Sequence, residues 1–361
     1  MTNNIIPIQE YCSELGEGFL ERLSPQVINL VVAPTGSGKT HFFVTGMSRE
    51  YKVGVLAPFT ALTSQIYAAN ADYALEAGIK ASDTINMANG VIASFHSSEK
   101  LLEMSHIDFL IIDEIHELIN YAGFTKGMIQ RFWKTIDTLK KQNPTLKIIA
   151  LTGTPQFIKM ADFLDIETWV IDPVKIKAKP SDLEVDSSWK TELNAKDSYI
   201  YLYSAKRSGV QLANKYDGEF LSSANKTLTD SYTDIINGQM PNSRLFTSTL
   251  IATGVSIHDP VEYVYTDWVD IVTIVQMSAR VRQGGHKLRV RQVSYPPYLA
   301  GKRISDIEKP VLKWGKNYEK NFRLLKEYQE WYSIQAHQDP EVLESILHQM
   351  LWHPELSLPP L

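Results

Sequence analysis

Short runs of apolar, often β-branched residues recur along the first half of the chain and are separated by longer polar or amphipathic stretches. Such runs are too short for typical helices and are typical of strands buried on both faces of a parallel sheet. They are Val27–Val32, Val53–Ala57, Val91–Ala93, Phe109–Ile112 and Ile148–Leu151. The second half has similar runs at Tyr199–Tyr203, Arg244–Leu250 and Lys287–Ser294. The pattern predicts an α/β protein with mostly parallel sheets flanked by helices.

Apolar residues at helical spacing predict helices over Gln9–Leu23 and Trp314–Tyr328. The dipeptide Asp339-Pro340 predicts the start of a final helix that reaches about Trp352. We expect the aromatic face of 314–328 to pack on a domain formed by the second half of the chain. The alternative is that basic side chains and an aromatic ring of this helix contact a nucleic-acid strand.

The segment Asp172–Lys196 is rich in Lys, Asp, Pro and Ser and shows little periodicity. A chain of 361 residues fits two domains of ordinary size. We therefore expect a first domain over 1–175, a linker over 176–196 and a second domain over 197–300. The remaining residues, 301–361, are expected to form a small helical C-terminal extension.

The composition is that of a globular protein, with 44% hydrophobic and 21% charged residues. Because the net charge is −5, nucleic acid would have to be bound by a local patch or by backbone amides. The single cysteine, Cys12, excludes an internal disulfide and a cysteine-rich zinc site. The chain shows no signal-peptide pattern and no apolar run of membrane-spanning length, so we expect a cytoplasmic protein.

The run Val27–Val32 leads into Ala33-Pro34-Thr35-Gly36-Ser37-Gly38-Lys39-Thr40. Its glycines allow a tight turn whose N–H groups point at an anion, and the following helix directs its positive end there. We expect Thr35, Gly36, Ser37, Gly38, Lys39 and Thr40 to bind ATP. Lys39 would reach the β- and γ-phosphates, and the Thr40 hydroxyl would bind Mg²⁺.

Acidic residues directly follow the run Phe109–Ile112, in the order Asp113-Glu114-Ile115-His116. Carboxylates at the end of a buried strand are costly unless they bind something charged. We expect Asp113 to complete the Mg²⁺ site and Glu114 to polarise the attacking water. His116 would link this site to the other domain.

Residues at or near the ends of other predicted strands are candidate contacts to a nucleic-acid backbone, most through a hydroxyl group and Lys206 through its charge. These are Pro58, Thr60, Ser94, Ser204, Lys206, Thr247 and Thr249. Ordinary turns are the alternative for the first two, helix capping for Ser94 and a solvated basic turn for Lys206. Thr152 and Thr154 are expected to couple the acidic tetrad to the second domain.

The motifs APTGSGKT, LAPFTALTSQ, DEIH and LTGTP, in this order, resemble motifs I, Ia, II and III of superfamily 2 helicases of the DExH type. The resemblance implies two tandem RecA-like domains, with ATP in the cleft between them and nucleic acid across both. It also implies that Gln9 reads the adenine edge, with a surface glutamine as the alternative.

The second half resembles motifs IV to VI of the same helicases. TSTLIATGVSI is similar to motif V, in which Gly254 permits a close backbone approach. DIVTIVQMSARVRQ, over Asp270–Gln283, is similar to motif VI, which implies a helix here. Gln276 and Arg280 would then share one helix face toward the γ-phosphate. Gln283 stands where a second arginine is expected, with Arg282 one residue earlier. This Arg-Val-Arg form is similar to the herpesvirus origin-binding helicases and their phage or bacterial relatives.

We therefore expect an ATP hydrolase, dependent on Mg²⁺, that moves along DNA (favoured) or RNA. By analogy the direction is 3′ to 5′. We expect a monomer in a bacterial or phage-infected cytosol, acting in replication or repair and recruited by another protein. The alternative is an ATP-gated clamp or assembly factor that binds nucleic acid without unwinding it.

Overall fold

The computed structural model describes residues 4–34, 36–58, 84–87, 90–123, 125–175, 179–186, 193, 197–203, 206–222, 230–249, 255–293, 299 and 301–361. The chain divides into two compact units. Unit 1 comprises Met1–Ile176 and Val311–Glu327, and unit 2 comprises Lys177–Pro310 and Tyr328–Leu361. The expected C-terminal extension is therefore divided between the two units, and residues 177–196 of the expected linker belong to unit 2.

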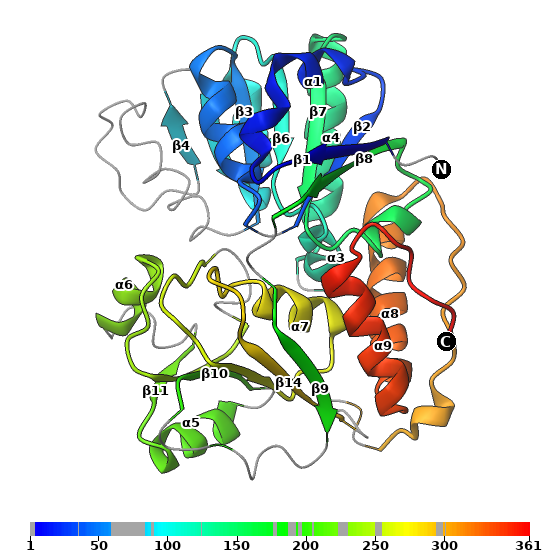
Figure 1. Cartoon of the computed structure of the whole chain (residues 1–361). Helices are drawn as coiled ribbons and strands as arrows, with labels where there is room; N and C mark the ends of the chain where they lie inside the picture. Colours follow the sequence, from blue (N-terminus) through cyan, green and yellow to red (C-terminus); the bar gives the residue numbers. More distant parts are fainter. Residues whose placement is uncertain are drawn as a thin grey trace. The chain divides into compact units, whose positions relative to one another are not determined.

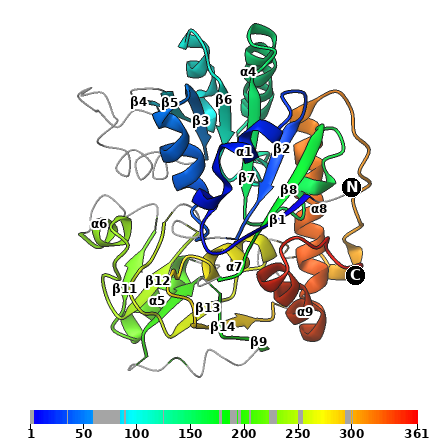
Figure 2. The same ribbon diagram turned by 45° about the horizontal axis from the view of Figure 1, so that its top comes forward.

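Unit 1 is built on an eight-stranded sheet with the order β1-β8-β2-β7-β6-β3-β5-β4 (Figures 1 and 2). Neighbouring strands are parallel except β4 and β5. Every residue of β2, β3 and β6 is buried, as expected for parallel strands covered on both faces. The strands are β1 (Asn4–Ile8), β2 (Ile28–Val32), β3 (Val53–Ala57), β4 (Thr84–Met87), β5 (Gly90–Ser94), β6 (Phe109–Ile112), β7 (Lys147–Thr152) and β8 (Ile166–Pro173).

Helical segments lie on both faces of this sheet, with α1 and α4 on opposite sides in Figure 2. The helix predicted over Gln9–Leu23 is divided, because Gly16 takes a positive φ of 63° between a short 3-10 turn and α1. Phe19 of α1 packs edge-on against Trp169, with ring centroids 5.5 Å apart. The helical segments are η1 (Cys12–Leu15), α1 (Gly16–Arg22), η2 (His41–Gly46), η3 (Met47–Arg49), η5 (Phe95–Glu103), α3 (Glu117–Tyr121), α4 (Met128–Gln142) and η6 (Ile158–Met160).

Unit 2 contains a six-stranded, all-parallel sheet with the order β11-β12-β10-β13-β14-β9. Strand β9 comes from the predicted linker and pairs with β14, where Arg289 forms ion pairs with Asp182 (2.9 Å) and Glu184 (3.0 Å). Polar residues of the linker thus form an edge strand. The strands are β9 (Asp182–Asp186), β10 (Tyr199–Leu202), β11 (Glu219–Leu221), β12 (Arg244–Thr247), β13 (Tyr263–Thr266) and β14 (Lys287–Arg291).

The core of unit 2 is aromatic, and Tyr199 packs edge-on against both Phe246 and Tyr265. The predicted start of the last helix is confirmed, since the Asp339 side chain accepts a hydrogen bond from the Glu341 N–H at 2.9 Å. The helical segments of unit 2 are α5 (Lys206–Lys215), α6 (Asp230–Ile236), α7 (Ile271–Ser278), η9 (Ile304–Asp306) and α9 (Pro340–Trp352).

Helix α8 (Tyr318–Ala336) belongs to unit 1 up to Glu327 and to unit 2 from Tyr328 onward. The expectation that its aromatic face packs on the second domain is wrong for its first part. Trp314, Tyr318 and Phe322 lie against Phe163 of unit 1. Spacing within a helix identifies an apolar face but does not identify the surface that covers it. Among the described residues, no helix is long and apolar enough to cross a membrane.

Candidate active site

The glycine-rich loop directly follows β2 at the carboxyl end of the parallel sheet of unit 1. Gly36 and Gly38 have positive φ angles of 89° and 76°, which glycine adopts at little cost. The Ser37 hydroxyl donates to the Pro34 carbonyl at 2.8 Å, so this side chain braces the turn. The predicted order of strand, loop and helical segment is confirmed, while Thr35 lies outside the described residues.

Lys39 is buried beside this loop, and its ammonium group donates to the carbonyls of Ala33 (2.8 Å) and Pro34 (3.1 Å). The backbone carbonyls of the loop therefore fix the position of the lysine ammonium group. A bound phosphate would offer this cation a stronger, charge-assisted partner than the two carbonyls.

Asp113 follows β6 and lies next to Thr40, although the two residues are 73 positions apart in the chain. The Thr40 hydroxyl donates to Asp113 Oδ2 at 3.0 Å. Burial of Asp113, which is 2% exposed, and the neighbouring Glu114 carboxylate raise the pKa of Asp113 to about 6. A cation bound here would offset the cost of a buried charge. One carboxylate and one hydroxyl fit Mg²⁺, which usually completes its shell with phosphates and water.

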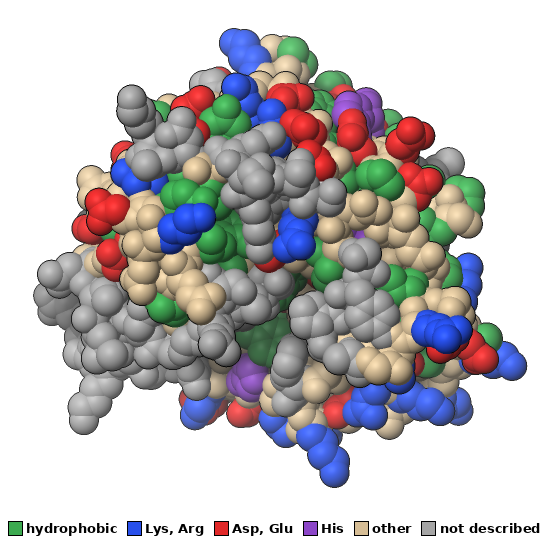
Figure 3. All heavy atoms as spheres, turned by 90° about the horizontal axis from the view of Figure 1, so that it is seen from below, with side chains coloured by type: hydrophobic (Ala, Val, Ile, Leu, Met, Phe, Trp, Pro, Cys, Tyr) green, Lys and Arg blue, Asp and Glu red, His purple; other side chains and the backbone are tan. Residues whose placement is uncertain are grey.

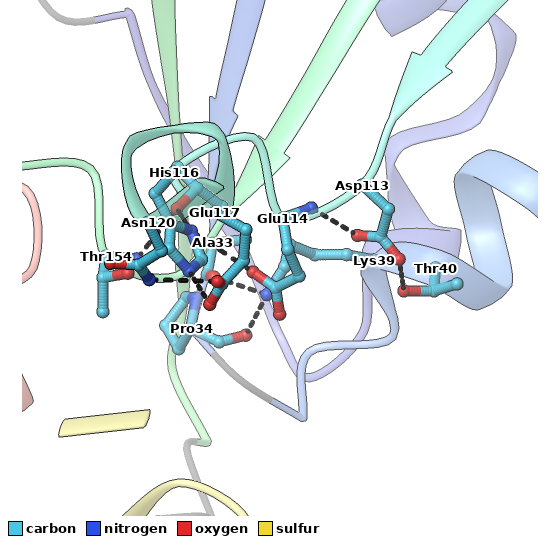
Figure 4. A network of polar contacts seen from close by, with 11 residues as sticks. Ala33, Pro34, Lys39, Thr40, Asp113, Glu114, His116, Glu117, Asn120 and Thr154 are labelled. Atoms are coloured by element: carbon cyan, nitrogen blue, oxygen red, sulfur yellow. Dashed lines mark hydrogen bonds and ion pairs between the residues drawn. The ribbon is translucent and has the colours of Figure 1, made fainter. Parts of the chain in front are cut away.

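Glu114 has an unusual backbone conformation, with a φ of 49°. A non-glycine residue in this region is strained, and such residues cluster at functional sites. Its N–H donates to Asp113 Oδ1 at 3.1 Å, and its side chain is 15% exposed. The Glu114 carboxylate is therefore partly open to solvent and lies beside the buried side chains of Lys39 and Asp113 (Figure 4).

His116 connects the acidic tetrad to the end of β7. Its Nδ1 lies 2.8 Å from the hydroxyl of Thr152, which also accepts a hydrogen bond from the Thr154 N–H at 3.0 Å. The Thr154 hydroxyl is buried and has no hydrogen-bond partner in the part of the chain that is described. The fold thus brings together the two motifs, DEIH and LTGTP, that the sequence assigns to coupling.

The remaining predicted residues of unit 1 make hydrogen bonds that do not connect them to the glycine-rich loop or the acidic tetrad. Gln9 is exposed just after β1, and its N–H donates to Glu14 Oε2 at 2.7 Å. The carbonyl of Pro58 accepts a hydrogen bond from the Tyr121 hydroxyl. Ser94 is buried and contacts the Ser97 hydroxyl, and it makes no capping hydrogen bond to η5.

In unit 2, the expectation that Gln276 and Arg280 share one helix face is wrong, because α7 ends at Ser278. Beyond that point Val281 pairs with Ile257, and the Ile257 N–H donates to the Arg280 carbonyl at 2.8 Å. Residues 279–283 therefore form turns around this single bridge and do not continue the helix. Gln276 and Arg280 are nevertheless both buried.

The two residues discussed for a second arginine position differ in their surroundings. Arg282 is half-buried, and its Nε and terminal nitrogen donate to the Ser256 hydroxyl at 2.8 and 2.6 Å. Gln283 is exposed and donates to the His258 carbonyl at 2.6 Å. Arg282 is therefore held by the loop that contains Ser256, whereas Gln283 faces solvent.

The nucleic-acid candidates of unit 2 follow the ends of its parallel strands. Thr247 is buried at the end of β12 and donates to the Ser248 carbonyl at 3.0 Å, and Thr249 is half-buried. Lys206 begins α5, with its side chain outside the description. Thr60, Ser204 and Gly254 also lie outside the described residues.

One buried acid next to the predicted site was not singled out from the sequence. Glu117, the first residue of α3, is 2% exposed and has one carboxylate oxygen 3.4 Å from His116 Nε2. Its position immediately after the tetrad is the only sequence feature that could have drawn attention to it.

Residues 19–163 match the DEAD/DEAH box helicase family. The helicase match contains the glycine-rich loop, the acidic tetrad and the LTGTP segment. No curated protein matches the chain in the corresponding comparison.

Two solved structures are similar to this chain. One is the DEAD-box helicase Mss116 bound to ssRNA and UDP-BeF, with a TM-score of 0.52 and 14% identity over 99% of this chain and 95% of that one. The other is a DEAD box protein from the hyperthermophile Methanococcus jannaschii, with a TM-score of 0.40 and 13% identity over 76% and 83%. The similarity to the first, together with the two parallel sheets, identifies the fold as two tandem RecA-like domains.

Proposed function

We propose that this protein is an ATP-dependent helicase or translocase that couples ATP hydrolysis to movement along a nucleic-acid strand. The observation that carries the proposal is the meeting of Lys39, Thr40, Asp113 and Glu114 at one end of the unit 1 sheet. The match of residues 19–163 to the DEAD/DEAH box helicase family supports the same activity.

Each of these side chains has a distinct proposed role. Lys39 would bind the β- and γ-phosphates, and Thr40 with Asp113 would hold Mg²⁺, which neutralises phosphate charge. Glu114 would orient water and accept its proton. Arg280 of unit 2 is proposed as the arginine finger that stabilises charge on the γ-phosphate, with Gln276 and Arg282 assisting.

We propose DNA as the strand on the basis of the resemblance in motif VI, and movement from 3′ to 5′ by analogy with helicases of the DExH type. The net charge of −5 argues against a broad basic surface. On the face drawn in Figure 3, Lys and Arg side chains are interspersed with Asp and Glu. Binding would therefore depend on local contacts such as strand-end hydroxyls and amides. Because few phosphates would be neutralised, the binding affinity should decrease only weakly as the salt concentration rises.

The test is the ATPase rate with single-stranded DNA, duplex DNA and RNA at a stated salt concentration. We expect stimulation by the preferred strand and a loss of about 100-fold or more in Lys39→Ala and Glu114→Gln. Glu103→Gln changes an exposed carboxylate of the same unit and should behave like the parent. Parent-like hydrolysis in both site variants would contradict the assigned roles.

A strand-displacement assay on a tailed duplex then examines the coupling. ATP-driven separation supports a helicase. Tight ATP-dependent binding without separation or movement would instead indicate a nucleotide-gated clamp. Arg280→Ala should lower the stimulated rate by about 1,000-fold if the side chain acts as a finger.

A further inference from the structure

Glu117 is a buried carboxylate that the proposed hydrolysis steps do not use. Its Oε2 accepts a hydrogen bond from the Asn120 side chain at 3.0 Å. Its Oε1 is buried, accepts no hydrogen bond within the described residues, and lies 3.4 Å from His116 Nε2. A buried carboxylate is costly unless a partner compensates its charge. A small rotation of the imidazole would make His116 Nε2–H that partner.

The position of the Glu117 carboxylate indicates which ring nitrogen of His116 donates a hydrogen bond and which accepts one. Two carboxylates face the ring, with Glu117 Oε1 3.4 Å from Nε2 and Glu114 Oε2 3.6 Å from Nδ1. The Thr152 hydroxyl is nearer to Nδ1, at 2.8 Å, and can donate to it, so the Glu117 carboxylate favours the tautomer that carries the proton on Nε2. Nδ1 is then an acceptor for the Thr152 hydroxyl at 2.8 Å, and the same oxygen accepts the Thr154 N–H at 3.0 Å. With this tautomer, Nε2–H faces Glu117, the Thr152 hydroxyl donates to Nδ1, and the Thr154 N–H donates to the Thr152 oxygen.

At Asn120 the hydrogen-bond network reaches α8, a helix more than 200 residues later in the chain. The Asn120 carbonyl accepts a hydrogen bond from the Lys326 ammonium group of α8 at 3.2 Å. The lysine side chain covers Gly123, where an added Cβ would lie 2.8 Å from Nζ. Within unit 1, α8 therefore fixes the end of the short helix that presents Glu117 and Asn120. Figure 4 shows Glu117 grouped with Asn120 and His116.

We propose that Glu117 is a positioning residue for His116, held in place by Asn120 and, through the Asn120 backbone, by Lys326. It sets the tautomer and orientation of the imidazole that connects the acidic tetrad to Thr152. The inference rests on the proposed function, because it assigns His116 a part in coupling hydrolysis to strand binding.

The kinetic test is a double-mutant cycle on strand-stimulated ATP hydrolysis. Glu117→Gln keeps the size of the side chain and an acceptor for Asn120 but removes the charge. We expect it to lower the stimulated kcat roughly tenfold, with the KM for ATP unchanged, as for other residues that support a functional side chain. In a His116→Ala background the same change should have no further effect. An equal loss in both backgrounds would overturn the proposal, because it would indicate a general structural role.

Asn120→Ala provides a second variant that leaves Glu117 in place and releases it. It should show the same dependence on His116 with a smaller loss, so the test does not depend on the folding of one variant. Glu103→Gln is the matched control, an exposed carboxylate on η5 that is expected to leave both rates unchanged.

A second measurement does not require activity. Nitrogen-15 NMR of labelled histidines, with His116→Ala used for assignment, reports the tautomer in the protein alone. We expect the Nε2–H form in the parent and a shift toward Nδ1–H in Glu117→Gln. Identical spectra for the His116 ring in the two proteins would refute the inference. If the parent shows no ATPase activity, the proposed function fails and the NMR result still decides the role of Glu117.

Discussion

Replacing Asp113 with asparagine should stabilise the nucleotide-free protein at neutral pH. The pKa of Asp113 is raised to about 6, chiefly by burial and then by the Glu114 carboxylate. In the unfolded chain it is about 3.9, and a difference of about two corresponds to roughly 3 kcal/mol. The side chain is 2% exposed, so solvent screening reduces this value little.

The sign of the effect follows from proton binding. Between about pH 4 and 6 the folded state binds more protons at Asp113 than the unfolded state does. Ionisation of Asp113 therefore lowers the free energy of unfolding as the pH rises through this range. Asparagine has a similar shape and carries no charge, so Asp113→Asn should be more stable than the parent at pH 7.5 by up to about 3 kcal/mol and by little near pH 4.

The assay is calorimetric unfolding of parent and variant, without nucleotide or Mg²⁺, at pH 4, 5, 6 and 7.5. Only the difference between the proteins is interpreted, because other groups also titrate. Glu103→Gln should show a small difference at every pH. The reasoning would be refuted if Asp113→Asn were no more stable than the parent at pH 7.5, or if its advantage did not change with pH. The same variant should lose Mg²⁺-dependent ATPase activity.

Two further predictions concern unit 2. Burial lowers the pKa of His286 and His337 to about 4, so the unfolded state binds more protons below pH 6.5 and stability should fall as the pH drops from 6.5 to 4. His337→Gln should reduce this loss, measured as the change in urea midpoint between pH 7 and 5, and an unchanged loss would contradict the assignment. Gly218→Ala places a Cβ 2.6 Å from the Phe246 ring and 2.8 Å from the Arg244 carbonyl, so it should destabilise by about 1–3 kcal/mol. Gly18→Ala, which meets nothing within 4 Å, is its control in thermal unfolding, and equal melting temperatures for the two variants would argue against overpacking.

Most strands were predictable because their residues are apolar on both faces. The run Phe109–Ile112 coincides with β6, and Val53–Ala57 coincides with β3. Strands with polar residues were missed, as for β9, whose charges are paired with Arg289 of the neighbouring strand. An edge strand of this kind has no apolar pattern, and it forms because a partner supplies both hydrogen bonds and opposite charge.

The end of α7 shows a similar limit. The resemblance to motif VI implied a helix as far as Gln283, but α7 ends at Ser278 and Val281 pairs with Ile257 instead. Local periodicity does not include a strand partner that lies more than twenty residues earlier in the chain. For the same reason the sequence identified the aromatic face of 314–328 but assigned it to the wrong unit.

The sequence by itself determined which residues form the glycine-rich loop and the acidic tetrad, because residue types, spacing and flanking strands are local properties. Only the tertiary structure decided that Thr40 lies 3.0 Å from Asp113, and that Glu117 lies between His116 and Asn120. It also decided that a C-terminal segment is attached to the helix after the tetrad. These relations depend on the order of strands in a sheet and on which surfaces bury apolar area, and both are properties of the whole chain.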